Sequence, residues 1–325
     1  MSNTSIIDQL YTEQEIQQFK QSFDRDGYLV FPALIPKLIS KGADIPSPDE
    51  LKEHMHQLIE QFFKEEFKHM KASIFTTQDQ AKKTDEYFVG SGDKIRYFFE
   101  EDAMDKNGNL VVDHSKAINK VGHALHDQDE VFRKFSYHPE LARLANHLGL
   151  GDMITVQSMY IFKQPHIGGF VSPHQDNTFL HTKPMSCIGF WFAMEDVTLE
   201  NGCMWAVPGS HKAGIVQRFV LSPDNPNAVT FVPADADDAA PWKSVAEEFN
   251  RANNPEQWKP LTCPQGSLVV LHGNVVHMSD KNTSDKSRHA YTFHMVNRKA
   301  HYSENNWLHR PNDKPFTGFA DHVKL

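Results

Sequence analysis

Cysteine is scarce in this chain of 325 residues. The three cysteines, Cys187, Cys203 and Cys263, are odd in number and far apart. A disulfide framework needs pairs, and zinc sites built on cysteine usually place two of them a few residues apart. The pattern therefore argues against both kinds of site and is typical of a reducing compartment.

Long apolar runs and basic clusters are also missing. The longest apolar run, Cys187 to Met194, is far shorter than the roughly 20 residues that span a bilayer. The first residues, "MSNTSIIDQLYTEQEIQ", lack the basic and apolar regions of a secretory signal. A formal net charge of −9 argues against a basic surface that would bind nucleic acid. We therefore expect a small-molecule substrate, with neither nucleic acid nor membrane as partner.

The expected compartment is the cytoplasm. The C-terminal "VKL" resembles a peroxisomal tripeptide only loosely, because the small first residue is missing, so a peroxisomal location is the weaker alternative. The sequence leaves the oligomeric state open.

The first half of the chain reads as helical. Residues 12–27 predict a short helix that Gly27 ends, followed by a strand in "YLVFPALI". A second stretch repeats apolar residues at helical spacing and predicts a long helix packed on its own domain. This apolar stripe consists of Leu51, Met55, Leu58, Ile59, Phe62, Phe63, Phe67 and Met70.

From Thr155 onward short β-type runs alternate with Gly, Pro, Asn and Asp. The runs are "TVQSMYIFK", "SCIGFWFAM", "CMWAVPGSH", "GSLVVLHG" and "AYTFHMVN". They predict an antiparallel sandwich or barrel with helices packed outside, a mainly β fold with flanking helices (α+β). We expect one domain over 1–325, helix-rich in 1–150, with the β core in 151–300. A polar, acidic insertion at 222–264 either carries selectivity or is a surface excursion.

The stretch "SPHQD" places an imidazole and a carboxylate two residues apart, at His174 and Asp176. The same spacing recurs at His138 and Glu140, and the composition alone predicts roughly two or three such cases. His138 lies in a helical pattern, where residues i and i+2 diverge by about 200°. His174 follows a β-rich run, and in extended chain the two side chains point the same way. Only His174 and Asp176 are therefore predicted to share a metal ion.

A third ligand should come from another strand, and His277 is the best candidate, with His272 as its rival. Two imidazoles and one carboxylate form the facial triad of non-haem Fe(II) oxygenases, which leaves three positions open. A 2-oxo acid can fill two of them, and its distal carboxylate then needs a guanidinium such as that of Arg288.

Other functions use the same ligand types. A zinc-dependent hydrolase or lyase acting on an anionic substrate remains an alternative, as does a non-catalytic jelly-roll module that binds a metal and a 2-oxo acid. The position of Arg288 favours iron.

Several motifs resemble the phytanoyl-CoA dioxygenase family of Fe(II)/2-oxoglutarate oxygenases. They are "QSMYIFKQPH", "SPHQD", "TLENGCMWAVPGSH" and "HGNVVHMSDKNTSDKSRHAY", and the likeness extends from "FDRDGYLVFPALI" to "AYTFHMV". The resemblance implies a double-stranded β-helix core, the jelly roll or cupin-like fold. It also implies a dioxygenase that hydroxylates a small organic substrate and releases succinate and CO2. The implied cofactors are Fe(II), 2-oxoglutarate and O2, with ascorbate as a candidate reductant.

The resemblance also assigns residues. It implies His174, Asp176 and His277 as iron ligands and Arg288 as the partner of the distal carboxylate of 2-oxoglutarate. It implies further cosubstrate contacts from Lys120, Met159, Trp191 and Ser279. For Met159 and Trp191 the residue types alone indicate core positions. The identity of the primary substrate does not follow from the resemblance.

Overall fold

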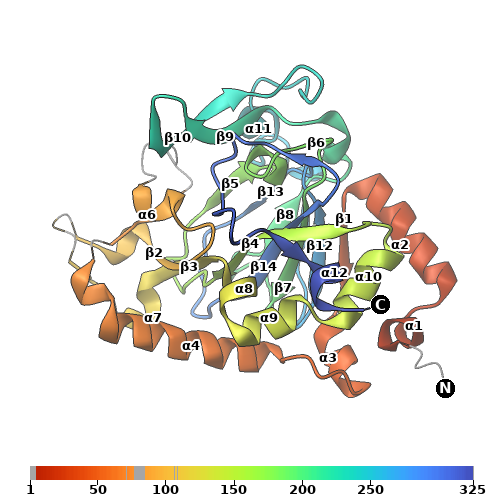
Figure 1. Cartoon of the computed structure of the whole chain (residues 1–325), viewed down its shortest axis with the longest axis horizontal. Coiled ribbons are helices and arrows are strands. Elements are labelled where there is room, and N and C mark those ends of the chain that lie inside the picture. Colours follow the sequence, from red (N-terminus) through yellow and green to blue (C-terminus); the bar gives the residue numbers. More distant parts are fainter. Residues whose placement is uncertain (1–4, 71, 77–84, 106, 108, 325) are drawn as a thin grey trace.

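The computed structural model describes residues 5–70, 72–76, 85–105, 107 and 109–324. Its largest element is an antiparallel sheet of eight strands (Figure 1). In spatial order these are β1 (Tyr28–Phe31), β12 (Leu268–His272), β7 (Ile188–Ala193), β14 (Ala290–Asn297), β4 (Met153–Ile161), β3 (Ile118–His123) and β2 (Ile95–Phe99), with β16 (Thr317–Gly318) paired to β4.

A smaller sheet of four strands packs against the large one. Its order is β11 (Lys259–Leu261), β8 (Met204–Ala206), β13 (His277–Ser279) and β5 (Val171–His174). Two short ribbons complete the β structure, β9 (Gln217–Ser222) with β10 (Asn225–Pro233) and β6 (Thr182–Lys183) with β15 (His301–Tyr302). Two packed antiparallel sheets with outer helices confirm the predicted fold class.

Strand β7 shows why the large sheet forms the middle layer. Phe190 and Phe192 belong to the core shared with the helices, whereas Trp191 and Ala193 belong to the core shared with the small sheet. Successive strand residues point to opposite faces, so a strand covered on both sides must be apolar throughout. That requirement explains the continuous run "IGFWFA".

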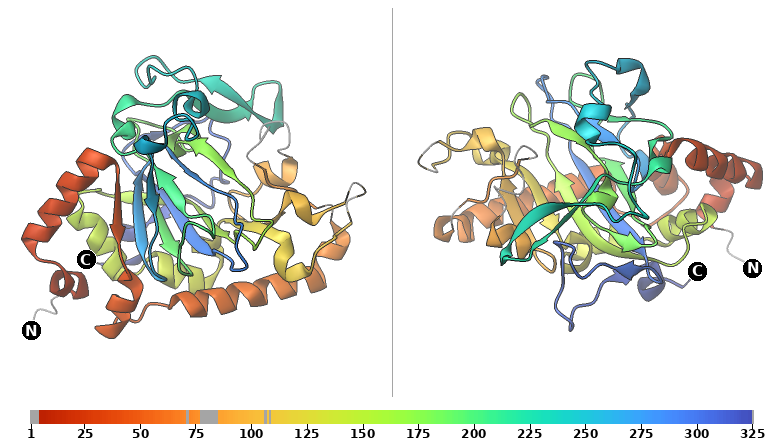
Figure 2. Two further views of the ribbon diagram at one scale, coloured as in Figure 1. Left: turned by 180° about the vertical axis from the view of Figure 1, so that it is seen from behind. Right: turned by 90° about the horizontal axis from the view of Figure 1, so that it is seen from above.

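Helices cover the outer face of the large sheet, and Figure 1 and the left view of Figure 2 show α4 running along the lower edge, beneath α8 and α9 in Figure 1. The described residues include the helices α1 (Ile6–Leu10), α2 (Glu13–Asp26), α3 (Leu34–Ser40), α4 (Pro48–Glu65), α6 (Glu86–Val89), α7 (His114–Ala117), α8 (Leu125–Gln128), α9 (Glu130–Ser136), α10 (Pro139–His147), α11 (Val245–Glu248) and α12 (Phe319–His322). Helix α11 contacts β5 of the small sheet instead. Short 3-10 turns are η1 (Phe67–His69), η2 (Glu101–Ala103), η3 (Asp176–Thr178), η4 (Ser210–Ala213) and η5 (Pro255–Gln257).

The predicted helix stop at Gly27 is confirmed. Thr12 and Glu15 form a capping box at the start of α2, and Gly27 ends the helix in the left-handed region at φ 80°. The strand predicted over "YLVFPALI" is wrong beyond Phe31, because Leu34–Ser40 is helix α3. A short apolar run does not distinguish a buried strand from a buried helix, and Pro32 removes a donor from the strand.

The apolar stripe forms helix α4, as predicted. Leu51, Met55, Ile59, Phe62 and Phe63 are buried in the core that the helices share with the large sheet. The helix ends at Glu65, and the three remaining stripe residues, Leu58 within α4, Phe67 in η1 and Met70 just after it, are partly buried and pack on the same core.

Residues 222–264 contain β10, α11, η5 and β11. The segment lies at the top of the view in Figure 1, and β11 extends the small sheet beside β8. Phe249 and Trp258 of this segment pack against Val276 and Met278, which flank His277. The insertion therefore supports the strand that carries one of the predicted metal ligands.

No helix in the described part of the chain is both long and apolar enough to cross a membrane. The tripeptide "VKL" ends at Leu325, which lies outside the described residues.

Candidate metal and cosubstrate site

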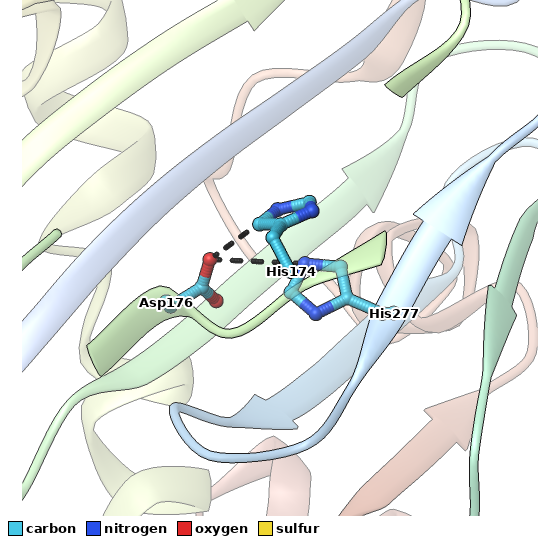
Figure 3. A group of neighbouring side chains, drawn as sticks. All are labelled: His174, Asp176 and His277. Carbon is cyan, nitrogen blue, oxygen red and sulfur yellow. Dashed lines mark ion pairs between the residues drawn. The ribbon is translucent and has the colours of Figure 1, made fainter. Parts of the chain in front are cut away.

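The smaller sheet brings the three predicted metal ligands together (Figure 3). His174 ends β5, and the antiparallel neighbour β13 places His277 directly opposite it. Asp176 begins the 3-10 turn η3 and does not continue the strand, so the predicted extended geometry holds only through Gln175. Gln175 anchors the bend, because its amide nitrogen donates to two backbone carbonyls at 2.6 and 2.8 Å.

The three side chains leave room for one ion. Oδ1 of Asp176 lies 3.9 Å from Nε2 of His174 and 3.7 Å from Nε2 of His277. Two donors bound at about 2.1 Å to the same ion lie at most about 4.2 Å apart. Both distances satisfy that limit, and one ligand atom from each residue lies within 4.8 Å of the other two.

Backbone contacts orient both imidazoles for metal binding. Nδ1 of His174 lies 2.8 Å from the carbonyl oxygen of Ser172, and Nδ1 of His277 lies 3.0 Å from that of Val275. A carbonyl only accepts, so each Nδ1 carries the hydrogen and each Nε2 keeps its lone pair. A metal-binding histidine needs this tautomer, with its other nitrogen held by the protein.

Burial and nearby charges shift the pKa values of His174 and Asp176. Burial, together with the nearby His277, lowers the pKa of His174 to about 4. Burial alone would raise the pKa of Asp176, but the surrounding imidazoles of His294, His277 and His174 hold it below its ordinary value. At neutral pH the site therefore offers a carboxylate and an uncharged imidazole at these two positions.

The structure places the rival histidines elsewhere. His272 lies at the end of β12, where its ring is 5.0 Å from that of His211. His138 caps α10 from just outside it, and its Nδ1 accepts from the backbone N–H of Glu140. The Glu140 carboxylate turns away to accept from the backbone N–H of Ile7 at 2.7 Å. The helical pair thus does not converge, although His138 precedes the helix and is not inside it.

A cavity of about 190 Å³ is lined by the three predicted ligands, His174, Asp176 and His277. Its wall includes all five residues that the resemblance assigns to the cosubstrate, namely Lys120, Met159, Trp191, Ser279 and Arg288. Met159 and Trp191 therefore line the cavity, although Trp191 also packs in the core between the sheets.

Arg288 and Lys120 are buried cations without an ion pair among the residues that the structure describes. The Arg288 guanidinium donates to the carbonyl of Gly202 at 3.1 Å and lies 5.4 Å above the Trp191 ring. Nζ of Lys120 lies 3.7 Å from Sδ of Met159 and 3.6 Å above the Phe75 ring. Burial lowers the pKa of Arg288 to about 10 and that of Lys120 to about 7. Two uncompensated cations in one cavity favour an anionic ligand.

Three ionisable residues of the cavity wall were not predicted: Glu100, Lys163 and His294. Glu100 is the buried first member of the acidic run Glu100–Asp102, and burial raises its pKa. Lys163 donates from Nζ to the carbonyl of Gly169 at 2.6 Å. The sequence offered one signal for His294, which lies on strand β14 an even number of residues after Arg288. In an extended chain such a spacing places both side chains on the same face.

Comparison with known protein families gives a match over most of the chain. The phytanoyl-CoA dioxygenase (PhyH) family model matches residues 6–290. Phytanoyl-CoA dioxygenase domain-containing protein 1 of Rattus norvegicus is 44% identical over 254 residues, 76% of this chain and 82% of the rat protein. A phytanoyl-CoA dioxygenase of Arabidopsis thaliana is 40% identical over 289 residues, 89% of this chain and 91% of the plant protein.

Solved structures share the fold at low sequence identity. The non-haem α-ketoglutarate-dependent carbocyclase SnoK from nogalamycin biosynthesis has a TM-score of 0.56 at 17% identity, covering 98% of this chain and 100% of its own. EctD from S. alaskensis with 2-oxoglutarate and 5-hydroxyectoine has a TM-score of 0.53 at 15% identity, covering 91% of this chain and 78% of its own. These likenesses support the jelly-roll architecture.

Proposed function

The chain belongs to the phytanoyl-CoA dioxygenase family, and from that premise we propose that it is an Fe(II)- and 2-oxoglutarate-dependent dioxygenase that hydroxylates a small organic substrate. One observation carries the proposal. A cluster of His174, Asp176 and His277 opens onto the same cavity as two buried, unpaired cations, Arg288 and Lys120. A metal site alone would fit many enzymes, but the added cations suit a dicarboxylate bound beside the metal.

The metal and cosubstrate supply the oxidising chemistry: with Fe(II) bound, 2-oxoglutarate and O2 are converted to succinate and CO2 while a substrate C–H bond is oxidised. The protein's own residues hold and orient the reactants. Nε2 of His174, Nε2 of His277 and Oδ1 of Asp176 would hold the iron. Three ligands on one side leave the opposite positions for the oxo acid and O2.

Arg288 would bind the distal carboxylate of 2-oxoglutarate through its guanidinium. The hydrogen bond that Arg288 donates to the carbonyl of Gly202 holds the side chain in place. Because the guanidinium is buried, its charge would bind a carboxylate more strongly than an exposed one would. Lys120, Ser279, Met159 and Trp191 line the same cavity and would complete the cosubstrate pocket.

The primary substrate would occupy the aromatic part of the cavity. Phe75, Phe88, Phe179 and Trp307 line this part, which can exclude water from the reacting groups. A formal charge of −9 and the absence of a basic cluster in the sequence support a small molecule over nucleic acid. Three free buried cysteines support a cytoplasmic location.

The test measures succinate formed from 2-oxoglutarate by protein purified without oxygen and supplied with Fe(II), with and without ascorbate. We expect turnover in the wild type and its loss in His174→Ala and Arg288→Ala. Equal turnover in all three proteins would refute the proposal. Full occupancy by zinc in the purified protein, without any oxo-acid dependence, would support the zinc hydrolase alternative.

A further inference from the structure

A fourth imidazole approaches the metal site from the large sheet. His294 lies in the middle of β14 and is buried, and its Nε2 is 3.4 Å from Oδ2 of Asp176. The other carboxylate oxygen, Oδ1, faces His174 at 3.9 Å and His277 at 3.7 Å. Oδ1 of Asp176 therefore faces His174 and His277, and Oδ2 faces His294.

His294 is not placed as a fourth ligand. The ligand atoms that gather within 4.8 Å of one another come from His174, Asp176 and His277, and His294 does not join that cluster. It contacts the carboxylate at Oδ2, whereas the ion-pair contacts of the two imidazoles are with Oδ1. An ion held between Oδ1 and those imidazoles would leave Oδ2 with His294.

The neighbouring strand leaves space for this contact. Gly189 of β7 is the register partner of His294 on β14. A methyl group at Gly189 would lie 3.4 Å from the His294 ring and 3.5 Å from Oδ2 of Asp176, so a larger side chain would enter the space that the two groups share. Glycine at this position keeps the imidazole and the carboxylate in contact.

The burial of His294 is otherwise hard to explain. Its Nδ1 and Oδ2 of Asp176 are both buried and make no conventional hydrogen bond. A buried polar atom without a partner is costly, and an apolar residue would avoid that cost. What the imidazole supplies that an apolar side chain would not is a ring nitrogen, Nε2, that can carry a hydrogen and lies 3.4 Å from Oδ2.

We propose that His294 is a positioning residue: it donates from Nε2 to Oδ2 of Asp176 and so holds this carboxylate as a ligand through Oδ1 alone. The inference rests on the proposed function, because only a metal that must accept both a 2-oxo acid and O2 needs all three remaining positions. If Oδ2 rotated onto the ion, it would take one of those positions. Residues that hold a metal ligand in this way typically change metal affinity 10- to 100-fold when removed, an order-of-magnitude expectation.

The experiment compares His294→Leu and His294→Gln with wild type, using His272→Gln as the control. His272 lies on β12 of the same large sheet, outside the ligand cluster. Metal affinity is titrated without oxygen, first with Fe(II) and then with Co(II), and the visible absorption of the Fe(II) protein with 2-oxoglutarate is recorded. Melting temperature of the metal-free protein reports folding separately.

We expect His294→Leu to bind both metals at least tenfold more weakly and to shift the visible absorption. His294→Gln can still donate to Oδ2 and should recover most of the affinity, and the control should match wild type. Wild-type affinity and absorption in His294→Leu would overturn the proposal, as would equal losses in the Leu and Gln variants. If His294→Leu does not fold, a metal affinity of His294→Gln below one tenth of the wild-type value counts against the proposal and a near-wild-type value supports it.

The Co(II) titration does not require turnover. Loss of Co(II) affinity in His294→Leu therefore supports the role of His294 even if the wild type makes no succinate. A wild type that binds metal but consumes no 2-oxoglutarate would refute the proposed function, and the effect of His294→Leu on Co(II) affinity would still stand.

Discussion

Removal of the Lys120 ammonium should stabilise the metal-free protein while weakening cosubstrate binding. Lys120 is 5% exposed and has no ion-pair partner within the described residues. Its nearest polarisable neighbours are Met159 and the Phe75 ring. The substitution Lys120→Met keeps an unbranched, flexible side chain one atom shorter and removes the charge, so it tests mainly the electrostatic contribution.

The magnitude follows from the pKa. Burial lowers the pKa of Lys120 from 10.5 to about 7. One pKa unit corresponds to about 1.4 kcal/mol, so charging this group in the folded state costs at most roughly 5 kcal/mol. Because the unfolded chain binds the proton more tightly, wild-type stability should rise between about pH 7 and 10.5. The advantage of Lys120→Met should be largest below pH 7 and shrink towards zero near pH 10.5.

Thermal unfolding of metal-free protein at pH 6, 7.5 and 9 measures this difference. A change of 1 kcal/mol moves the melting temperature by roughly 2–4 °C in domains of 150–250 residues, so several degrees are expected at pH 6. Lys116→Met, the same change at an exposed lysine nearby, should show no such pH-dependent gain. With Fe(II) and 2-oxoglutarate added, the wild type should gain more stability than Lys120→Met.

A Lys120→Met protein that melts at or below the wild-type temperature at pH 6 would refute the cost assigned to this buried ammonium. A difference in melting temperature that is the same at all three pH values would also refute it, because an unpaired ammonium must produce a pH-dependent difference.

Three further changes test the site. His277→Ala should reduce Fe(II)-dependent succinate formation by at least about 10³-fold, whereas His272→Ala should stay within about twofold, and comparable losses in both would contradict the ligand assignment. Arg288→Lys should weaken 2-oxoglutarate binding by roughly tenfold, because an ammonium replaces a bidentate fork; unchanged binding in a titration of the anaerobic protein would place the cosubstrate elsewhere. Glu100→Gln should raise the melting temperature at pH 7, because burial raises the pKa of Glu100 and its charged form opposes folding; this gain should disappear towards pH 4. The control Asp102→Asn, at an exposed residue, should not raise the melting temperature at pH 7. Equal shifts in the two variants would argue against a buried charge at Glu100.

The β core could be predicted because strand signals are local. Five predicted runs correspond to β4, β7, β8, β12 and β14, each an apolar stretch bounded by turn residues. The prediction was wrong at Leu34, where the same kind of apolar run forms a helix. Burial of Leu34, Ile35 and Leu38 satisfies either structure, and only packing on the core selects one.

Only part of the candidate metal site could be predicted from the sequence. The "SPHQD" spacing needed a partner, and His277 competed with His272 until the register of β13 on β5 placed His277 opposite His174. Register depends on pairing between strands about 100 residues apart. No local pattern reports that pairing, so the choice required either the family resemblance or the structure.

The positions of His294 and Glu100 in the cavity wall could not be predicted from the sequence. Both line the cavity, and His294 contacts Asp176, only because segments distant in the chain fold around the cavity. Composition and periodicity determined the fold class, and the spacing of His174 and Asp176 on an extended run gave two candidate ligands, because these features lie within single elements. The tertiary structure alone decided which oxygen of Asp176 faces the imidazoles and which faces His294, because that division depends on packing between two sheets.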